Sequence, residues 1–253
     1  MSSQFAGKIA LVTGGASGLG RTAALLLARE GAQVMVSDLC AKEGEETVRV
    51  ISKAGGQAHF VKADVTIAVE VEAMVNETIR QFGRLDFALN NAGIDGVRAR
   101  TADYPEVVWR QVIEVNLTGV FLCMKYELPH MVKQGGGAIV NLSSVAGVTG
   151  FPGHAAYTAS KHGVIGLTKT AALDYAPKKI RVNAVCPAYT RTPMVERMVK
   201  EFPELEQKLI ERVPLGRLGV PEEIAQAVVY LFSDAADFIT GHSLVLDGGI
   251  MAE

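Results

Sequence analysis

Short apolar runs alternate with longer amphipathic stretches along most of the 253-residue chain. A short run rich in Val, Ile and Leu is typical of a strand buried on both faces, whereas apolar residues three or four positions apart indicate a helix that packs on one face. The pattern predicts strands at residues 8–13, 32–38, 57–62, 85–90, 137–143, 180–186 and 243–246. It predicts helices at 18–30, 42–54, 67–82, 105–133, 155–175 and 221–232, with irregular helix within 191–211.

Alternation of strands and helices on this scale indicates the fold class. It predicts a parallel sheet of about seven strands with helices on both faces, an α/β doubly wound fold. The connections between such strands are expected to be right-handed. No linker, low-complexity tract or internal repeat interrupts the pattern, so residues 1–253 are expected to form a single domain.

A glycine-rich turn joins the first predicted strand to the first predicted helix. The segment Thr13-Gly14-Gly15-Ala16-Ser17-Gly18-Leu19-Gly20 has the spacing G-x-x-x-G-x-G. Glycines at such a turn let the backbone approach a pyrophosphate, and the helix end offers free N–H groups and a favourable dipole. The segment therefore indicates a Rossmann-type dinucleotide site. The alternative, a tight turn without a ligand, does not need three spaced glycines.

Asp38 ends the second predicted strand, at the position where a dinucleotide site reads the ribose. Its carboxylate can accept hydrogen bonds from the two ribose hydroxyls and would repel a 2′-phosphate. The neighbouring Leu39 and Ser17 are not basic, so no cation is evident for that phosphate. These residues predict NAD rather than NADP, although a solvated carboxylate at a strand end is the simpler alternative.

A candidate acid/base centre lies further along the chain. Tyr157 precedes Lys161 by four residues, so both side chains share one face if the segment is helical. A free tyrosine keeps its proton up to a pKa of about 10, and a nearby cation favours the phenolate. The Ser144 hydroxyl would hold a substrate oxygen beside the tyrosine. By itself the pattern is weak, because a Tyr four residues before a Lys is usually structural.

Composition and charge exclude several classes of protein. The chain is 49% hydrophobic and carries 25 basic and 27 acidic residues, a net charge of −2. Nothing indicates nucleic acid or an anionic membrane as a partner. We see no signal peptide and no apolar stretch of membrane-spanning length. Three scattered cysteines, Cys40, Cys123 and Cys186, predict reduced thiols in the cytoplasm, and no metal site is expected.

Together these motifs resemble the short-chain dehydrogenase/reductase superfamily, in its main branch of single-domain enzymes. The resemblance covers nearly the whole chain and the motifs keep the family's order. It implies a catalytic tetrad of Asn116, Ser144, Tyr157 and Lys161. It also implies a set of cofactor-binding residues: Gly14, Ser17, Gly18, Leu19, Gly20, Asp38, Leu39, Asp64, Val65, Asn91, Ala92, Gly93, Tyr157, Lys161, Pro187, Thr190 and Thr192.

Two positions need comment within this resemblance. The family usually has Pro-Gly where this chain has Pro187-Ala188. Glycine often marks positive φ or a close approach of backbone to ligand, so the departure puts the local geometry over the nicotinamide in question. Ser143 and Ser144 are adjacent on a strand and point to opposite faces, so only one can face the substrate. The family's spacing to the tyrosine selects Ser144.

The resemblance implies a mechanism for alcohol oxidation. Tyr157 as phenolate takes the hydroxyl proton while a hydride passes to the nicotinamide. Lys161 lowers the pKa of Tyr157 and hydrogen-bonds the nicotinamide ribose, and Ser144 polarises the substrate oxygen. Asn116 bends its helix and holds a water that carries the proton onward.

The segment 188–218 lies where the family carries its substrate lid. Its apolar residues fall three or four apart, which predicts either packing of the lid on the body or a pocket for a largely apolar secondary alcohol or ketone, cyclic ones included. Arg191 and Arg197 leave a carboxylate substrate open, and His154 is expected to be structural rather than a proton carrier. Candidate substrate contacts are Asp95, Val145, Phe151, His154, Tyr189, Met194, Met198 and Phe202.

The helices at 105–133 and 155–175 carry more apolar surface than one sheet face can cover. The resemblance implies that they pair between subunits, with the last strand as a second contact, in a homotetramer; a monomer is the alternative. Two other functions stay open. One is a 3-oxoacyl-thioester reductase, which would prefer NADP and a basic docking patch. The other is a catalytically silent NAD(H) sensor, although such proteins usually lack a tetrad residue.

Overall fold

Seven parallel strands form one sheet in the order β3-β2-β1-β4-β5-β6-β7. The computed structural model describes residues 4–202 and 204–252, without the side chains of Met194, Arg197, Met198 and Glu201. The central strands are buried from end to end, because helices cover both faces of the sheet. The strands are β1 Ile9–Thr13, β2 Gln33–Asp38, β3 Ala58–Lys62, β4 Phe87–Asn90, β5 Gly137–Leu142, β6 Ile180–Pro187 and β7 Ser243–Leu246.

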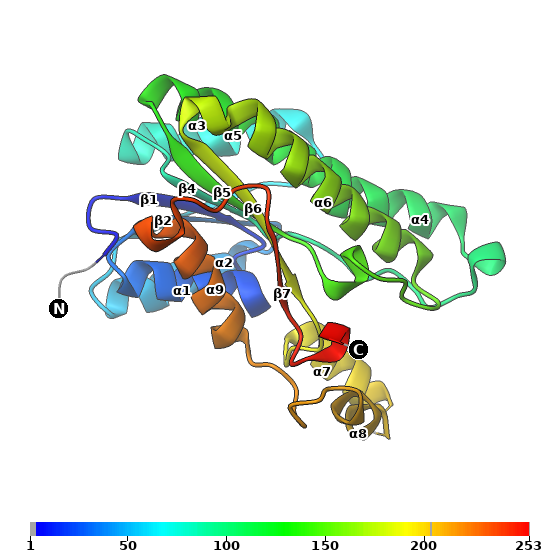
Figure 1. The fold of residues 1–253 in the computed structure, drawn as a ribbon. Helices are drawn as coiled ribbons and strands as arrows, with labels where there is room; N and C mark the ends of the chain where they lie inside the picture. The colour runs from blue at the N-terminus through cyan, green and yellow to red at the C-terminus, as the bar shows by residue number, and fades with distance from the viewer. Residues whose placement is uncertain (1–3, 203, 253) are drawn as a thin grey trace.

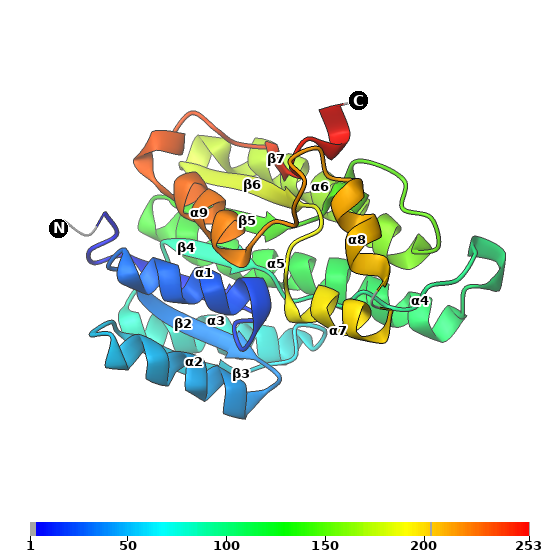
Figure 2. The same cartoon turned by 90° about the horizontal axis from the view of Figure 1, so that it is seen from below.

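Two layers of helices enclose the sheet (Figure 1). One layer holds α1 (Gly18–Arg29), α2 (Ala41–Lys53) and α9 (Pro221–Phe232). The other holds α3 (Ala68–Phe82), α4 (Glu106–Ile113), α5 (Gly119–Gln134) and α6 (Ala155–Tyr175). Figure 2 shows α7 (Pro193–Glu201) and α8 (Glu204–Glu211) beyond the strand ends. Short 3-10 turns occur at Thr101–Asp103, Val145–Gly147, Ala176–Lys178, Asp234–Ala236 and Ile250–Ala252.

Each helix layer packs against one face of the sheet and buries a separate apolar core there. Leu27 of α1 and Leu231 of α9 meet Val34 and Val140 on one face. Met74 of α3 and the residues of α5 and α6 meet Leu11 on the other. The predicted parallel sheet with helices on both faces is thus confirmed, since alternating strands and helices leave no other way to bury both faces of every central strand.

The element boundaries agree with the prediction to within two residues for most helices and strands, with two informative differences. The predicted helix 105–133 is interrupted by a π-turn at Glu114–Thr118 between α4 and α5. The irregular helix expected within 191–211 is two separate helices, α7 and α8. A π-turn adds a residue to the backbone turn without changing the apolar spacing much, so periodicity does not reveal it.

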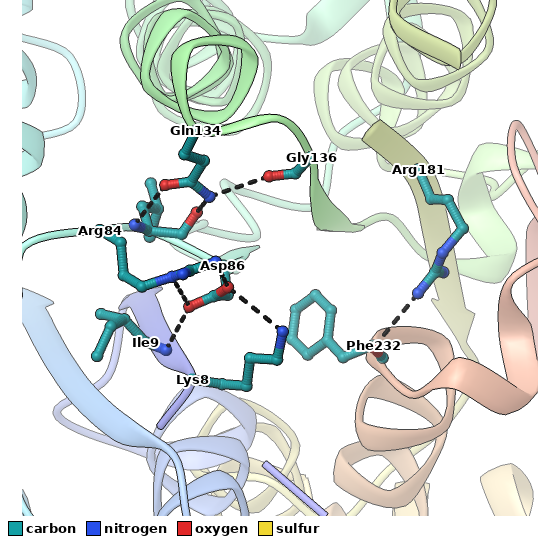
Figure 3. A network of polar contacts seen from close by, with 9 residues as sticks. Lys8, Ile9, Arg84, Asp86, Gln134, Gly136, Arg181 and Phe232 are labelled. Atoms are coloured by element: carbon teal, nitrogen blue, oxygen red, sulfur yellow. Dashed lines mark hydrogen bonds and ion pairs between the residues drawn. The ribbon is translucent and has the colours of Figure 1, made fainter. Parts of the chain in front are cut away.

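A polar network ties the sheet together at the amino ends of β1 and β4 (Figure 3). The buried Asp86 carboxylate accepts a hydrogen bond from the Ile9 amide at 2.9 Å and pairs bidentately with Arg84 at 2.9 and 2.6 Å. Lys8 adds a second cation, 3.6 Å from the same carboxylate. Bidentate Arg–carboxylate pairs are among the stronger polar contacts in proteins. The network therefore fixes β4 beside β1 at the edge opposite to the glycine turn.

The segment α7–α8 is joined to the body at a narrow base. Thr190 and Gly219 form a β-bridge, and the Arg191 amide donates to the Gly219 carbonyl at 2.9 Å. The Gly219 amide donates in return to the Tyr189 carbonyl at 2.9 Å. The two ends of the segment 191–218 therefore lie side by side.

The continuous helical stretch Glu106–Gln134 is long and apolar enough to pass a membrane-span test by length and composition. This corrects the expectation that no stretch reaches that length. The test is weak for a single helix, because the core helices of water-soluble proteins pass it as well. Part of the apolar surface packs in the core, where Val120, Leu128 and Met131 are buried, and Phe121 remains half exposed.

A buried polar seam crosses the core on the α5 side of the sheet. The Asn90 amide donates to Glu127 Oε2 and to Asn141 Oδ1, each at 3.1 Å, and Asn141 donates to Thr168 Oγ at 3.0 Å. Glu127 is fully buried, and its Oε1 has no partner among the described residues. Burial raises the pKa of Glu127 to about 7, with the Asn90 amide acting in the opposite direction.

The raised pKa of Glu127 predicts a pH-dependent stability. Because the folded chain binds this proton up to about pH 7 and the unfolded chain only to about 4.5, stability should fall as pH rises through that window. Glu127→Gln stays neutral, so it should exceed the wild type at pH 8 by up to about 3 kcal/mol, a gap that closes toward pH 5. Denaturant unfolding across this range measures the gap.

Glu72→Gln, on the exposed face of α3, is the matched control and should show no such trend. A Glu127→Gln difference that stayed constant between pH 5 and pH 8 would contradict the assignment.

Candidate active site

The predicted site residues converge at the carboxyl edge of the sheet. The glycine turn follows β1, Asn91 follows β4, Ser144 follows β5 and Pro187 ends β6. Tyr157 and Lys161 lie on the first two turns of α6. Ligands of open parallel sheets bind outside the carboxyl ends of the strands, so this is the position expected for a nucleotide and substrate site.

Ser143 and Ser144 point in opposite directions at the end of β5. Ser143 Oγ donates to the backbone carbonyl of Lys161 at 2.9 Å and so anchors α6. Ser144 Oγ donates to the Pro187 carbonyl at 3.4 Å and accepts from the Ala146 amide at 3.2 Å. The Ser144 hydroxyl also lies beside the Tyr157 phenol, whose pKa it lowers against the larger effect of burial. Ser144 therefore lies on the side of Tyr157, and its contact with a substrate stays a prediction.

Lys161 is 3% exposed, and its ammonium donates to the Leu142 carbonyl at 2.7 Å. It lies 5.5 Å from the centroid of the Tyr157 ring. Burial lowers the pKa of Lys161 to about 8. Burial also raises the pKa of Tyr157, and the Asp95 carboxylate raises it further. In the protein alone, burial therefore outweighs the predicted effect of Lys161 on Tyr157, and both groups are driven toward their neutral forms.

Asn116 lies in the π-turn and is fully buried. Its side chain accepts a hydrogen bond from the Ile94 amide and donates one to the Ile94 carbonyl, each at 2.8 Å. It also donates to Ser160 Oγ at 3.3 Å. These bonds connect α4–α5, the loop after β4 and α6. The predicted bend at Asn116 takes the form of a π-turn that aims the amide at Ile94.

The glycine turn is closed by the loop after β4. Gly14 and Gly18 have positive φ values of 64° and 51°. A Cβ on Gly14 would lie 2.7 Å from Asn91 Nδ2, and one on Gly20 would collide with the Gly14 carbonyl. Asn91 Nδ2 donates to the carbonyls of Thr13 and Gly14 at 2.9 and 3.2 Å. Glycine is thus required by close packing as well as by backbone conformation.

The first turn of α1 fits an anionic group. Ser17 occupies the N-cap position without capping the helix through its side chain, and no acidic residue lies in the first turn. The free N–H groups and the helix dipole therefore face the loop. Asp38 accepts from the Ala16 amide and the Cys40 amide, each at 3.0 Å, which fixes its carboxylate beside the turn. These residues fit a dinucleotide.

Asp64 and Val65 follow β3 on the same edge. Asp64 Oδ1 accepts hydrogen bonds from the amide and hydroxyl of Thr66 at 2.9 and 2.7 Å. Val65 is 8% exposed and packs against Gly119, where an added Cβ would lie 2.9 Å from its side chain. Their local contacts shape the loop, and the remaining carboxylate oxygen of Asp64 has no described partner.

Ala188 replaces the family's glycine without backbone strain. Among the described residues, Lys179 is the single non-glycine with positive φ, so Ala188 does not need the freedom of glycine. Its amide donates to the Leu246 carbonyl at 3.0 Å. Thr190 Oγ donates to the Ala188 carbonyl at 3.2 Å, and Thr192 Oγ accepts from the Val195 amide at 3.4 Å. Hydrogen bonds within the stretch and to the Leu246 carbonyl therefore hold the segment over the predicted nicotinamide position.

The predicted substrate contacts divide into two groups. The rings of Phe151 and His154 pack at a tilt with centroids 4.4 Å apart, and His154 Nδ1 lies 3.1 Å from the Pro152 carbonyl, so the histidine has a structural contact. Val145 follows Ser144 in a 3-10 turn, and Asp95 acts on Tyr157 from the loop after β4.

The predicted contacts from the lid are more dispersed. Tyr189 lines a cavity of about 210 Å³ together with residues of α9 and the C-terminal segment, and its hydroxyl accepts from Arg212 at 3.2 Å. Phe202 is half exposed. The side chains of Met194 and Met198 lie outside the described part of the chain.

Three contributors are not evident from the sequence patterns. Ser143 holds the backbone of Lys161, the Leu142 carbonyl holds its ammonium, and Ser160 links Asn116 to the Tyr157 carbonyl at 3.3 and 2.7 Å. Ser160 lies within the Tyr157–Lys161 motif, which is a weak signal for it. A carbonyl acceptor such as Leu142 leaves no trace in residue type.

Known proteins are similar to this chain both in sequence and in fold. A family model described as "Enoyl-(Acyl carrier protein) reductase" matches residues 14–251. The cyclohexanol dehydrogenase of Acinetobacter sp. (strain SE19) is 46% identical over 98% of this chain and 96% of its own. A 2,5-dichloro-2,5-cyclohexadiene-1,4-diol dehydrogenase of Sphingobium indicum is 44% identical over 99% of both chains. A 3-oxoacyl-[acyl-carrier-protein] reductase of Thermotoga maritima is 41% identical over 97% of this chain and 98% of its own.

The crystal structure of an NAD+-bound xylitol dehydrogenase superposes with a TM-score of 0.94 at 38% identity, covering 97% of this chain and 99% of that one. The chain belongs to the short-chain dehydrogenase/reductase family. The dehydrogenases named above match this chain over nearly the full length of both proteins. The chain is therefore an enzyme of the oxidoreductase class.

The two adjacent serines predict contrasting variants. Ser144→Ala removes the hydroxyl beside Tyr157 and should lower kcat/KM by about 10²-fold, the usual effect of losing one donor to a reacting oxygen. Ser143→Ala removes the bond to the Lys161 carbonyl and should lower unfolding stability by about 1 kcal/mol with a smaller loss of activity. Steady-state kinetics and denaturant unfolding of both variants measure these effects. Equal losses of activity would contradict the division of roles.

Proposed function

We propose that the enzyme is an NAD-dependent alcohol dehydrogenase or ketone reductase for largely apolar secondary alcohols and ketones, cyclic ones included. The observation that carries this proposal is the convergence of Ser144, Tyr157 and Lys161 at the sheet edge that also holds the glycine turn. A hydroxyl, a phenol and a buried ammonium together can bind an alcohol oxygen and move its proton.

Each residue has a distinct role in this proposal. NAD supplies the two-electron acceptor when it is bound. Tyr157 takes the hydroxyl proton, and Ser144 holds and polarises the alcohol oxygen. Lys161 supplies the positive charge that favours the phenolate, and an oxidised nicotinamide adds to that charge, which opposes the effect of burial on the pKa of Tyr157. Asn116 keeps the loop and helices around this centre in register.

The preference for NAD rests on Asp38. Its carboxylate is fixed beside the glycine turn by two backbone N–H groups. It forms no ion pair with a described Lys or Arg, so its negative charge stays available to repel a 2′-phosphate. The similarity to a xylitol dehydrogenase that was solved with NAD+ bound gives further support.

The proposed substrate class rests on the lid and on the relatives. Two relatives are named for six-membered cyclic alcohols, cyclohexanol and a cyclohexadiene diol. The described apolar residues of α7 and α8, such as Val195, Val199 and Leu209, would form the matching cover. A ring alcohol presents one reacting C–O bond and a largely apolar body, which suits such a site.

The 3-oxoacyl-thioester reductase is the second candidate, favoured by the family description and by one relative. A carrier-bound acyl chain would need free cations near the lid. Arg191 pairs with Glu206 at 2.6 Å and Arg217 with Glu223 at 2.6 Å, whereas Lys200, Lys208 and Arg212 form no ion pair among the described residues. The argument against that candidate is therefore Asp38, which opposes the NADP that such a reductase would prefer. The complete tetrad argues against a silent NAD(H) sensor.

A substrate panel tests the proposed function. The purified enzyme should form NADH with cyclohexanol and consume it with cyclohexanone, and should be far slower with NADP(H). Tyr157→Phe should lose about 10²–10⁴-fold in kcat, because the proton acceptor is gone, while NADH binding measured by fluorescence stays near the wild-type value. Turnover with NADP(H) alone, or near-normal turnover by Tyr157→Phe, would contradict the proposal.

We further propose that the enzyme is a homotetramer in the cytoplasm. Its three cysteines form no disulfide, which suits a reducing compartment. Trp109 of α4, Phe121 of α5 and Leu173 of α6 are exposed on the helices that the family pairs between subunits. Phe238, close to β7, is fully exposed and suits the second contact.

Sedimentation tests the tetramer. The particle should have about four times the 26.9 kDa mass of one chain. Phe121→Glu places a charge on the proposed helix interface and should yield smaller particles, because an unpaired charge is costly to bury. Val69→Glu on α3 is the control, because Val69 is an exposed apolar residue outside that surface. A wild-type particle of single-chain mass would rule the tetramer out.

A further inference from the structure

The loop from Gly93 to Ala99 forms a wall of the site alongside α6. At its start, a Cβ on Gly93 would lie 3.7 Å from the Lys161 ammonium. At its end, the Ala99 amide donates to the Gly153 carbonyl at 3.0 Å, and Ala99 forms a bridge with His154. The loop therefore runs back along the first turns of α6 and passes Tyr157 between these two contacts.

The backbone on either side of Asp95 is fixed. The Asn116 side chain holds both the amide and the carbonyl of Ile94 at 2.8 Å. Gly96 has a φ of 77° and lies so close to Tyr104 and Val112 that a Cβ would be 2.5 Å from the Tyr104 hydroxyl. A residue held between two such neighbours has little freedom to turn away, so the position of Asp95 is set by the fold.

The Asp95 carboxylate has no hydrogen-bond or ion-pair partner in the part of the chain that the structure describes. Its side chain is partly buried. It lies near enough to Tyr157 for its charge to act on the phenol: burial raises the pKa of Tyr157 and Asp95 raises it further. A carboxylate beside a proton acceptor opposes the formation of a second negative charge there.

We propose that Asp95 determines substrate choice by accepting a hydrogen bond from a second hydroxyl of the substrate and by repelling substrates that carry a carboxylate. This inference rests on the proposed function and narrows its substrates to neutral cyclic diols. An ionised carboxylate is an acceptor only, and hydrogen bonds to it are stronger than neutral ones. A site with an unpaired acceptor favours a substrate that supplies the missing donor.

The test compares three substrates with NAD: cyclohexane-1,4-diol, cyclohexanol and 4-hydroxycyclohexanecarboxylate. In the wild type, kcat/KM should be highest for the diol and lowest for the carboxylate. Asp95→Ala should lower the ratio of kcat/KM for the diol over cyclohexanol by about ten-fold or more, the usual effect of losing a hydrogen bond to a charged group. Asp95→Asn removes the repulsion and should raise kcat/KM for the carboxylate relative to cyclohexanol by a similar factor.

Asp103→Asn, an exposed acidic residue in the next turn of the same connection, is the matched control and should leave both ratios unchanged. A second readout needs no turnover: with NADH present, cyclohexane-1,4-diol should raise the thermal midpoint of the wild type and not that of Asp95→Ala. Turnover of all three substrates with ratios that do not respond to Asp95 would overturn this inference and leave the proposed function standing. Absence of turnover with every cyclic alcohol would overturn both.

Discussion

The amide of Asn116 is the contact on which the arrangement of the site depends. One buried side chain holds the loop after β4 through Ile94 and reaches α6 through Ser160, while its own backbone forms the π-turn between α4 and α5. A buried amide must satisfy both its donor and its acceptor, so the three segments cannot shift independently without leaving a polar group unpaired. The positions of Gly93, Asp95 and Lys161 relative to one another follow from this bond set.

Burial acts on the two central groups in the same direction. It lowers the pKa of Lys161 to about 8 and raises the pKa of Tyr157, so at pH 7 the lysine keeps its positive charge while the phenol keeps its proton. The charge of Cys186 acts on the pKa of Lys161 in the opposite direction to burial, and the Leu142 carbonyl gives the ammonium a hydrogen-bond acceptor. The charge states of Lys161 and Tyr157 therefore depend on the charge and the hydrogen bonds that a bound ligand would add beside them.

The sequence predicted the features that repeat or that require a specific residue type. The parallel sheet followed from apolar periodicity and the glycine turn from its spacing, whereas the full tetrad was implied by the resemblance to the family. The π-turn at Glu114–Thr118, the Leu142 carbonyl that binds Lys161 and the seam around Glu127 escaped prediction, because they depend on backbone atoms and on partners distant in the chain. Ser143 was passed over as the serine facing away from the substrate, although it anchors Lys161.

The narrow base of the segment 191–218 has a consequence for how such enzymes diverge. Because Arg191, Gly219 and Tyr189 are joined there by backbone hydrogen bonds, the two ends of the segment meet independently of its side chains. The Leu215 amide within the segment also donates to the Gly248 carbonyl at 3.1 Å, so an exchange confined to α7 and α8 spares this contact, the sheet and the Asp86 network at the opposite edge. The segment that we propose as the cover of the site can therefore change in sequence and length without rebuilding the catalytic scaffold, which is a simple route to new substrates.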